Sequence, residues 1–359
     1  MLMPRHFGLI LLFVAALTSA GCQPAAPPGA DSSQPADSPT EITAVEGLAE
    51  LSGQVAIDGS STVYPVTEAV AEEFQAATSN RVRVTVGVSG TGGGFKKFAR
   101  GEIDVSAASR PILKSEMAAA AENKIQFVEL PVCFDALTVV VNPQNDWVDA
   151  ITIDDLKKIW EPAAEGKVLK WSDVRPEWPD ERMILYGPGA DSGTFDYFTE
   201  AVVGKAKASR GDFTPSEDDN TLVQGVEGSK YALGYFGYAY YEANQKRLKA
   251  LKIIPPGKNE GVAPSPETVL SGAYTPLSRP LFIYVNRQAA ERPEVRKFCE
   301  FYLRNVPKLA QEVAYIPLPA EAYTQVLARL EKLAVGTAFG GEAQVGVPIQ
   351  EILSRPLTP

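Results

Sequence analysis

Three short turns rich in glycine, serine and threonine have the residue types best suited to binding a small ligand. They are DGSSTVYP (58–65), VSGTGGGF (88–95) and GPGADSGTFDYF (187–198). Each turn joins a strand-like run to a helix-like run, so its hydroxyls and backbone N–H groups fall at the positive end of a helix dipole. Glycine lets the backbone approach a ligand closely. The turns therefore predict a binding site for a small, oxygen-rich anion.

Helix capping is the alternative explanation for any one of these turns, because Ser, Thr and Asp are favoured N-cap residues. Three turns with the same chemistry favour a shared ligand instead. The predicted ligand-binding residues within them are Ser60, Ser61, Thr62, Ser89, Gly90, Thr91, Ser192, Gly193 and Thr194.

A cation must balance the anion, and Arg110 is the candidate, because it directly follows the strand-like run 102–109. Its planar guanidinium can grip two oxygens of an oxyanion at once. A surface arginine beside Pro111 is the alternative. Asp191 could orient Arg110 or accept a proton from the ligand, or it could simply cap the following helix.

Several other chemistries are excluded by composition and motif. The only histidine is His6, so a chain that loses its N-terminal segment has no imidazole for hydrolysis, acid–base catalysis or zinc binding. The glycine turns fit neither a nucleotide P-loop nor a dinucleotide fingerprint. A net charge of −10 argues against a nucleic-acid partner. We therefore expect no catalytic residues, no metal and no cofactor.

Strand-like and helix-like runs alternate along the chain, which predicts an α/β fold with buried sheets. The runs 137–142 and 281–286 are continuously apolar, as in strands buried on both faces. The acidic run 216–220 is predicted to be a loop, and Cys133 and Cys299 to be buried, unpaired thiols. The other predicted strands are 55–59, 81–89, 102–109 and 181–187, and the predicted helices are 65–78, 95–101, 151–160, 194–203, 293–305 and 322–334.

The N-terminal segment has the organisation of an export signal. Residues 1–21 combine a short basic start, an apolar run and small residues, as signal peptides do, and Cys22 follows directly. This arrangement predicts lipidation of Cys22, with ordinary secretion as the alternative. Residues 22–50 are rich in Pro, Ala and Ser and carry only acidic charges, so we expect a disordered tether.

The four segments DGSSTVYP, SGTGGGF, DVSAASRP and ADSGTFDYF, in this order, resemble the periplasmic phosphate-binding proteins of Pst-type ABC transporters. The resemblance implies a two-lobed periplasmic-binding-protein fold of type II, with the ligand in a cleft between the lobes. One lobe would comprise residues 51–135 and 277–345, and the other residues 136–276. The resemblance also places the three turns around the anion.

Two departures from the family pattern concern charge. Where well-known members end a strand with an aspartate that accepts a ligand proton, this chain has Ser109, followed by Arg110. Where they place an arginine before the third turn, this chain has Pro188 and Gly189. The guanidinium is therefore expected at Arg110, and the proton acceptor at Asp191.

The resemblance implies that the chain captures inorganic phosphate outside the cytoplasm and delivers it to an ABC permease, as a monomer anchored to the membrane through lipidated Cys22. It would not be an enzyme. Another tetrahedral oxyanion, such as sulfate or molybdate, is the alternative ligand, because the family aspartate is missing. An exported hydrolase of phosphate esters is an alternative of a different class.

Overall fold

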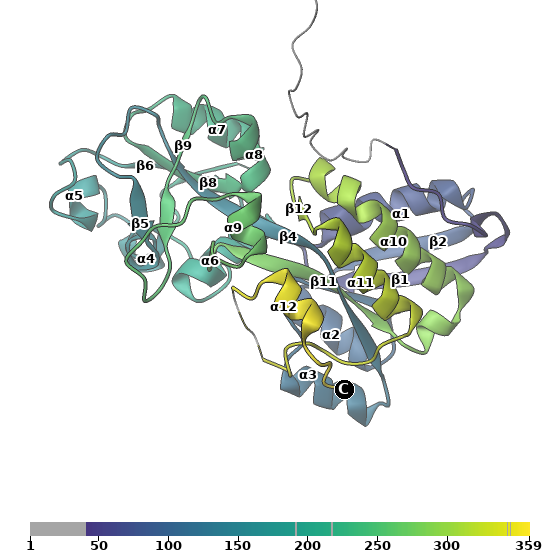
Figure 1. Ribbon diagram of the computed structural model, residues 1–359. Coiled ribbons are helices and arrows are strands. Elements are labelled where there is room, and N and C mark those ends of the chain that lie inside the picture. The colour runs from purple at the N-terminus through teal and green to yellow at the C-terminus, as the bar shows by residue number, and fades with distance from the viewer. Residues whose placement is uncertain (1–40, 191, 217, 343, 345) are drawn as a thin grey trace, which may run out of the picture. The chain divides into compact units, whose positions relative to one another are not determined.

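A computed structural model describes residues 41–359 except 191, 217, 343 and 345. The predicted signal peptide, Cys22 and Asp191 therefore lie outside the described residues. Strands and helices alternate along the described chain, in an α/β arrangement (Figure 1). In this part of the chain, no helix has both the length and the apolar character needed to cross a bilayer.

The first part of the sheet has the strand order β2-β1-β3-β11-β4. Strand β1 (Gly53–Gly59) pairs in parallel with β2 (Val82–Val88) and with β3 (Val105–Ala108). Strand β11 (Ser278–Asn286) returns antiparallel between β3 and β4 (Phe127–Val141). The carboxyl ends of β1, β2 and β3 therefore lie together, and the first two turns predicted to bind the anion begin there.

Helices cover this part of the sheet in two groups (Figure 1). Helix α10 (Pro293–Glu312) packs against α1 (Tyr64–Ala77) and α11 (Ala320–Glu331). Helix α2 (Thr91–Ala99) packs against α3 (Lys114–Glu122). The remaining short elements are η1 (Leu48–Glu50), η3 (Ala289–Glu291), β12 (Ile316–Pro317) and α12 (Ile349–Ser354).

Strand β4 continues into a second part of the sheet. Its residues 127–136 pair with β11, whereas residues 137–141 pair with β8 (Ala232–Gly237). Strands β6 (Ile184–Pro188) and β7 (Thr214–Ser216) extend this part beyond β8. Strand β9 (Lys249–Ala250) also pairs with β4, whereas β5 (Ala150–Thr152) and β10 (Lys252–Ile254) form a separate two-stranded parallel sheet. The helices in this stretch of the chain are α4 (Ile153–Trp160), η2 (Pro162–Ala164), α5 (Trp171–Val174), α6 (Gly193–Val203), α7 (Asp219–Glu227), α8 (Tyr238–Ala243) and α9 (Pro266–Leu270).

Every residue of β4 and β11 is buried, which confirms the sequence prediction of strands covered on both faces. Aromatic side chains fill the layers beside these strands. Phe74 packs edge-on against Phe298 in the first part, and Trp160 packs edge-on against Tyr235 in the second. The thiols of Cys133 and Cys299 are free and buried, as expected, and burial raises the pKa of each.

Several segments differ from the sequence prediction. Strand β4 begins ten residues before the predicted strand 137–142, and α10 ends seven residues after the predicted helix 293–305. Residues 41–50, assigned to the disordered tether, lie against the body, because Val45 and Leu48 are buried and the Thr43 amide donates to Asn305. Part of the acidic run 216–220 is not a loop, since Asp218 caps α7 by accepting from the Asn220 amide. Helix α2 begins at Thr91, four residues before the predicted helix 95–101, so the glycines of its turn are helical.

Candidate anion-binding site

The first turn leaves β1 through Gly59, which has a φ of 144°. A Cβ atom at this position would lie 2.1 Å from the Ala107 carbonyl oxygen, so only glycine lets β1 pass so close to β3. The Ser60 amide donates to that carbonyl at 2.9 Å, and the Ser60 hydroxyl accepts from the Thr62 amide at 3.2 Å. These bonds fix the turn and leave Ser61 at its tip.

The second turn is held by Asp58 at the end of β1. The Asp58 carboxylate accepts hydrogen bonds from the Ser89 hydroxyl and from Lys97 Nζ, which lies at 2.5 Å. Burial alone would raise the pKa of Asp58, but these two bonds outweigh burial and lower it. The Ser89 hydroxyl therefore positions the turn. Thr91 faces Ser109, with their hydroxyl oxygens 3.1 Å apart.

The third turn reaches the first one directly. Ser192 caps α6 by accepting from the Thr194 amide at 3.2 Å. A Cβ atom on Gly193 would lie 3.0 Å from the Thr62 Cα and amide nitrogen atoms, so the two turns are in close contact. Asp191, which precedes this cap, lies outside the described residues.

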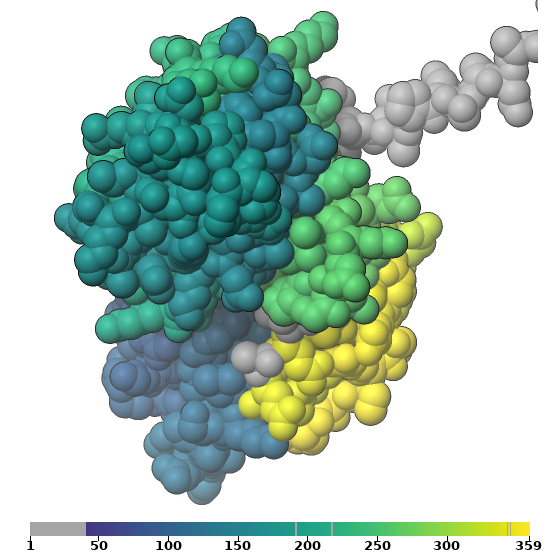
Figure 2. Space-filling view, turned by 90° about the vertical axis from the view of Figure 1, so that its left-hand side faces the viewer, coloured from purple at the N-terminus to yellow at the C-terminus, as the bar shows by residue number. Residues whose placement is uncertain are grey.

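A cavity of about 220 Å³ lies where these segments meet. It brings together seven of the predicted residues, namely Ser60, Ser61, Thr62, Gly90, Thr91, Ser109 and Arg110. Gly92, Asp196, Tyr197, Glu200, Ala206 and Arg279 complete its lining. We call it the polar compartment. Figure 2 shows the face of the molecule on which the teal residues approach the blue and yellow ones.

Four predicted residues are not part of the polar compartment. Ser192, Gly193 and Thr194 line a neighbouring hollow of about 340 Å³, which shares only Ser61 and Thr62 with the compartment. Ser89 lines neither space, because its hydroxyl is bonded to Asp58. In this structure the three turns therefore line two adjoining hollows that share Ser61 and Thr62, and the third turn stays a predicted part of the ligand site.

Arg110 lies at the polar compartment but already has an acidic partner. Its Nη1 and Nη2 atoms donate to the two carboxylate oxygens of Glu116 at 2.9 and 2.8 Å. Burial alone would lower the pKa of Arg110, but Glu116 raises it. The same Glu116 carboxylate also accepts from the Leu113 amide at 2.9 Å, at the start of α3. The sequence suggested that Arg110 would be free to balance the charge of the anion, but in this structure Glu116 already balances the charge of Arg110.

Arg279 on β11 is the cationic residue that sequence analysis missed. It is 9% exposed, and its Nη2 donates to the Thr62 hydroxyl at 2.8 Å. Its Nε has no hydrogen-bond partner and lies 3.7 Å from the Asp135 carboxylate. Its Nη1 lies 3.8 Å from Glu200. Arg279 is thus held in place with donor capacity remaining for a ligand.

A sequence signal for Arg279 was present. The tripeptide Ser-Arg-Pro occurs three times, at 109–111, 278–280 and 354–356; the first copy directly follows β3 and the second begins β11. Strands β3 and β11 are antiparallel neighbours, with Phe282 opposite Ala108. The end of β3 therefore lies near the beginning of β11, which brings both arginines to the polar compartment.

Two carboxylates lie close to Arg279, one buried and one partly buried. Asp135 is 2% exposed, and burial raises its pKa although Arg279 opposes this effect. Asp196 lines the polar compartment, and its Oδ1 has no hydrogen-bond partner but lies 3.9 Å from Lys207 Nζ. Burial also raises the pKa of Asp196. A carboxylate of this kind can accept a proton from a ligand.

A two-lobed α/β fold with hydroxyls and arginines around a cavity is the architecture of a solute-binding protein. Residues 44–306 match the PBP superfamily domain. The chain is 52% identical to protein SphX of Synechocystis, over 85% of this chain and 90% of that one. It is 37% identical to the phosphate-binding protein PstS of Staphylococcus saprophyticus, over 78% and 85%. The chain therefore belongs to the PBP superfamily and to its branch of PstS-like binding proteins.

Solved structures agree with this assignment. A crystal structure described as a possible phosphate binding protein from Planctomyces limnophilus matches with a TM-score of 0.76 and 50% identity, over 79% of this chain and 99% of that one. An ABC-type phosphate transport receptor from Vibrio cholerae matches with a TM-score of 0.56 at 22% identity, over 74% and 100%. The second match is a similarity of fold alone.

Proposed function

We propose that this chain binds inorganic phosphate in the polar compartment and presents it to the permease of an ABC transporter. The observation that carries the proposal is Arg279, whose Nε is buried without a hydrogen-bond partner at a cavity lined by hydroxyls. An oxyanion in the cavity could accept the charge-assisted hydrogen bond that the guanidinium of Arg279 still has available. The name of the phosphate-binding protein PstS, and the description of the Planctomyces limnophilus structure as a possible phosphate binding protein, support this ligand.

Selection against sulfate would depend on a carboxylate that accepts the proton of phosphate, since sulfate carries no proton at neutral pH. We propose Asp196 for this role, because its Oδ1 lies beside the polar compartment without a hydrogen-bond partner, with Lys207 Nζ 3.9 Å away as a salt-bridge partner. When sulfate is bound, the carboxylate has no proton to accept and remains opposite a negative charge. The free-energy cost of this unpaired acceptor is larger than the gain from a good hydrogen bond to phosphate. Asp191 remains the other candidate. Asp196→Asn should lower the ratio of phosphate affinity to sulfate affinity. An unchanged ratio would indicate that Asp191, and not Asp196, accepts the proton of phosphate.

The lobe boundaries are also part of the proposal. One lobe would contain residues 51–135 and 277–345, and the other residues 136–276. The change of pairing partner within β4, from β11 to β8 between residues 136 and 137, supports a boundary there. Movement of one lobe against the other about β4 and β11 would exclude water from the ligand and change the surface offered to the permease.

We further propose that residues 1–21 are a signal peptide, and that lipidated Cys22 anchors the protein outside the cytoplasm. The sequence pattern supports this location. The protein would act there as a monomeric carrier of its ligand and not as an enzyme.

Isothermal titration of the full chain with phosphate, sulfate and molybdate tests the proposed ligand. Phosphate should bind, and sulfate should not displace it at equal concentration. Preferential binding of sulfate or molybdate would replace phosphate as the ligand and keep the site. Binding of none of the three would overturn the proposal. Release of phosphate from a model ester, in proportion to pure protein, would instead indicate a hydrolase.

A further inference from the structure

The polar compartment continues past the arginines into a second space. This space, of about 290 Å³, shares five lining residues with the polar compartment, namely Ser109, Arg110, Tyr197, Glu200 and Arg279. The other lining residues are Pro111, Ala201, Pro276, Pro280 and Gln344. We call it the side compartment. The two compartments meet at the residues expected to hold the charge of the anion.

The walls of the side compartment differ in chemistry from those of the polar compartment. Pro111, Pro276 and Pro280 have no backbone N–H to donate. The Tyr197 hydroxyl donates to the Pro276 carbonyl at 2.7 Å, so this donor is already engaged. Ala201 contributes only a methyl group. A fourth phosphate oxygen turned toward the prolines and Ala201 would lose hydrogen bonds to water and gain none from these four residues.

A carbon substituent suits the same position. An alkylphosphonate, with its organic group on phosphorus, has three oxygens, and a phosphate monoester has three free oxygens beside its ester oxygen; both can carry a double negative charge. Those three oxygens can still face the serine and threonine turns and the guanidinium of Arg279. The substituent would then replace water against the prolines and Ala201, which is favourable for apolar atoms.

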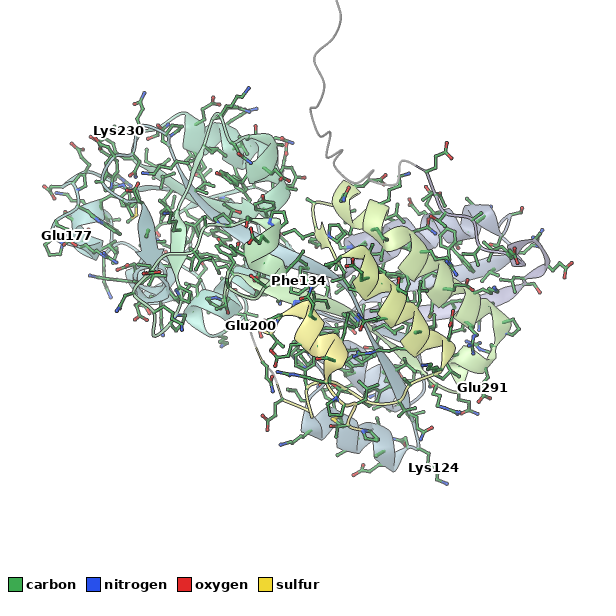
Figure 3. The ribbon with its side chains drawn as sticks, in the orientation of Figure 1. Lys124, Phe134, Glu177, Glu200, Lys230 and Glu291 are labelled. Atoms are coloured by element: carbon green, nitrogen blue, oxygen red, sulfur yellow. The ribbon has the colours of Figure 1, made fainter. Side chains whose placement is uncertain are left out.

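The rim of the side compartment is polar on one side. Glu200 extends from α6, with its side chain 57% exposed, and is labelled near the middle of Figure 3. Gln344 is held by a bond from Arg355 Nη1 to its side-chain oxygen at 2.8 Å. These two side chains can meet a hydroxyl or amino group at the end of a short substituent, whereas the proline walls meet its methylene groups.

We propose that the cavity also binds phosphorus oxyanions with one short organic substituent, that is, alkylphosphonates or phosphate monoesters. The substituent occupies the side compartment. This inference rests on the proposed function, because the three oxygens use the same site as inorganic phosphate.

The length of the substituent gives a quantitative test. Titration of the full chain with methyl-, ethyl- and propylphosphonate should show affinity rising about fourfold per added methylene, as expected for burial of apolar surface. A parallel titration with ethyl phosphate shows whether the site binds phosphate monoesters as well as phosphonates. Binding of either class, with affinity increasing with length, supports the proposal.

A substitution in the side compartment locates the effect. Ala201→Leu should fill the space, weaken propylphosphonate at least tenfold and leave phosphate affinity within twofold. Ala201→Ser keeps the volume and is the matched control. Equal weakening of phosphate and propylphosphonate by Ala201→Leu would overturn the proposal.

The unmodified chain provides a readout that needs no variant. If phosphate binds and none of the substituted anions competes with it at millimolar concentration, this inference fails while the proposed function stands. If phosphate itself does not bind, the proposed function has failed first.

Discussion

The guanidinium carbon of Arg279 lies 3.5 Å from the centroid of the Tyr197 ring. The arginine comes from β11 and the tyrosine from α6, so two segments far apart in the sequence meet at one cation–π contact. A desolvated contact of this kind is worth about 2 kcal/mol. It fixes the plane of the guanidinium beside the hydroxyl of Thr62, and this geometry leads to the first prediction.

Arg279→Lys should weaken phosphate binding by about 10- to 150-fold, the range for a charged hydrogen bond lost from a buried site. Arg110→Lys should have a smaller effect, because Glu116 already neutralises Arg110. Titration calorimetry measures both, and thermal unfolding checks that each variant folds. A larger loss of phosphate affinity in Arg110→Lys than in Arg279→Lys would show that Arg110 makes the main contact with the anion.

Ser61→Ala and Ser192→Ala separate ligand binding from helix capping. Ser61 lies at the tip of the first turn and should affect phosphate affinity with little change in stability. Ser192 caps α6, so its loss should lower the free energy of unfolding by about 1 kcal/mol. Urea unfolding and calorimetry on the same samples measure both quantities. A large loss of affinity in Ser192→Ala would show that the third turn does contact the ligand.

Gly193→Ala should weaken phosphate binding, because a Cβ atom there would lie 3.0 Å from backbone atoms of Thr62. Crowding of this kind costs about 1–3 kcal/mol and would displace the first turn. Gly211→Ala is the matched control, since its Cβ would lie 3.6 Å from a flexible glutamate side chain. If both variants bind phosphate like the unmodified chain, contact between the two turns has no role in binding.

Asp212 provides a pH-dependent contribution to stability away from the cavity. The Arg210 guanidinium lowers the pKa of Asp212 to about 2. Because the folded pKa is below that of the unfolded chain, about 3.9, the stabilisation is present above pH 4 and is lost as the pH falls toward 2. Asp212→Asn should therefore lower the free energy of unfolding at pH 7 by about 1 kcal/mol, since solvent screens this one-third exposed carboxylate.

Urea unfolding at several pH values tests this dependence. The difference between Asp212→Asn and the unmodified chain should shrink between pH 4 and pH 3. Asp180→Asn, in the fully exposed pair with Lys170, should change stability less at every pH. A difference for Asp212→Asn that does not vary with pH would show that its ionisation is not the cause.

Cys22→Ala tests the membrane anchor. If Cys22 is lipidated, the variant should move from the membrane fraction to the soluble fraction of the cell envelope. Ser19→Ala is a control that keeps the cysteine. Retention of Cys22→Ala on membranes after a high-salt wash would contradict lipidation at this residue.

The sequence was sufficient to predict the end of β4 and most of β11, because an unbroken apolar run has few structural alternatives in a chain of alternating strands and helices. It did not predict residues 127–136 of β4, which carry Glu129, Pro131 and Asp135 among the apolar residues. It also identified the first two turns of the polar compartment, where local glycine and hydroxyl patterns carry the information. It missed Arg279, because the apolar run was taken to begin at Leu281 and the antiparallel pairing with β3 is a tertiary property. The close contact of Gly193 with Thr62 is likewise a tertiary property, which the local pattern of either turn does not contain.

Glu116 accepts hydrogen bonds from two different groups, and this determines what would happen to it if an anion attracted Arg110. Its carboxylate accepts from Arg110 and also from the Leu113 amide at the start of α3. An anion that drew Arg110 away would therefore leave Glu116 still hydrogen-bonded and close to the positive end of a helix. Ligand binding at this position would then be an exchange of partners, in which Arg110 leaves Glu116 for the anion while the Glu116 carboxylate keeps its hydrogen bond from the Leu113 amide.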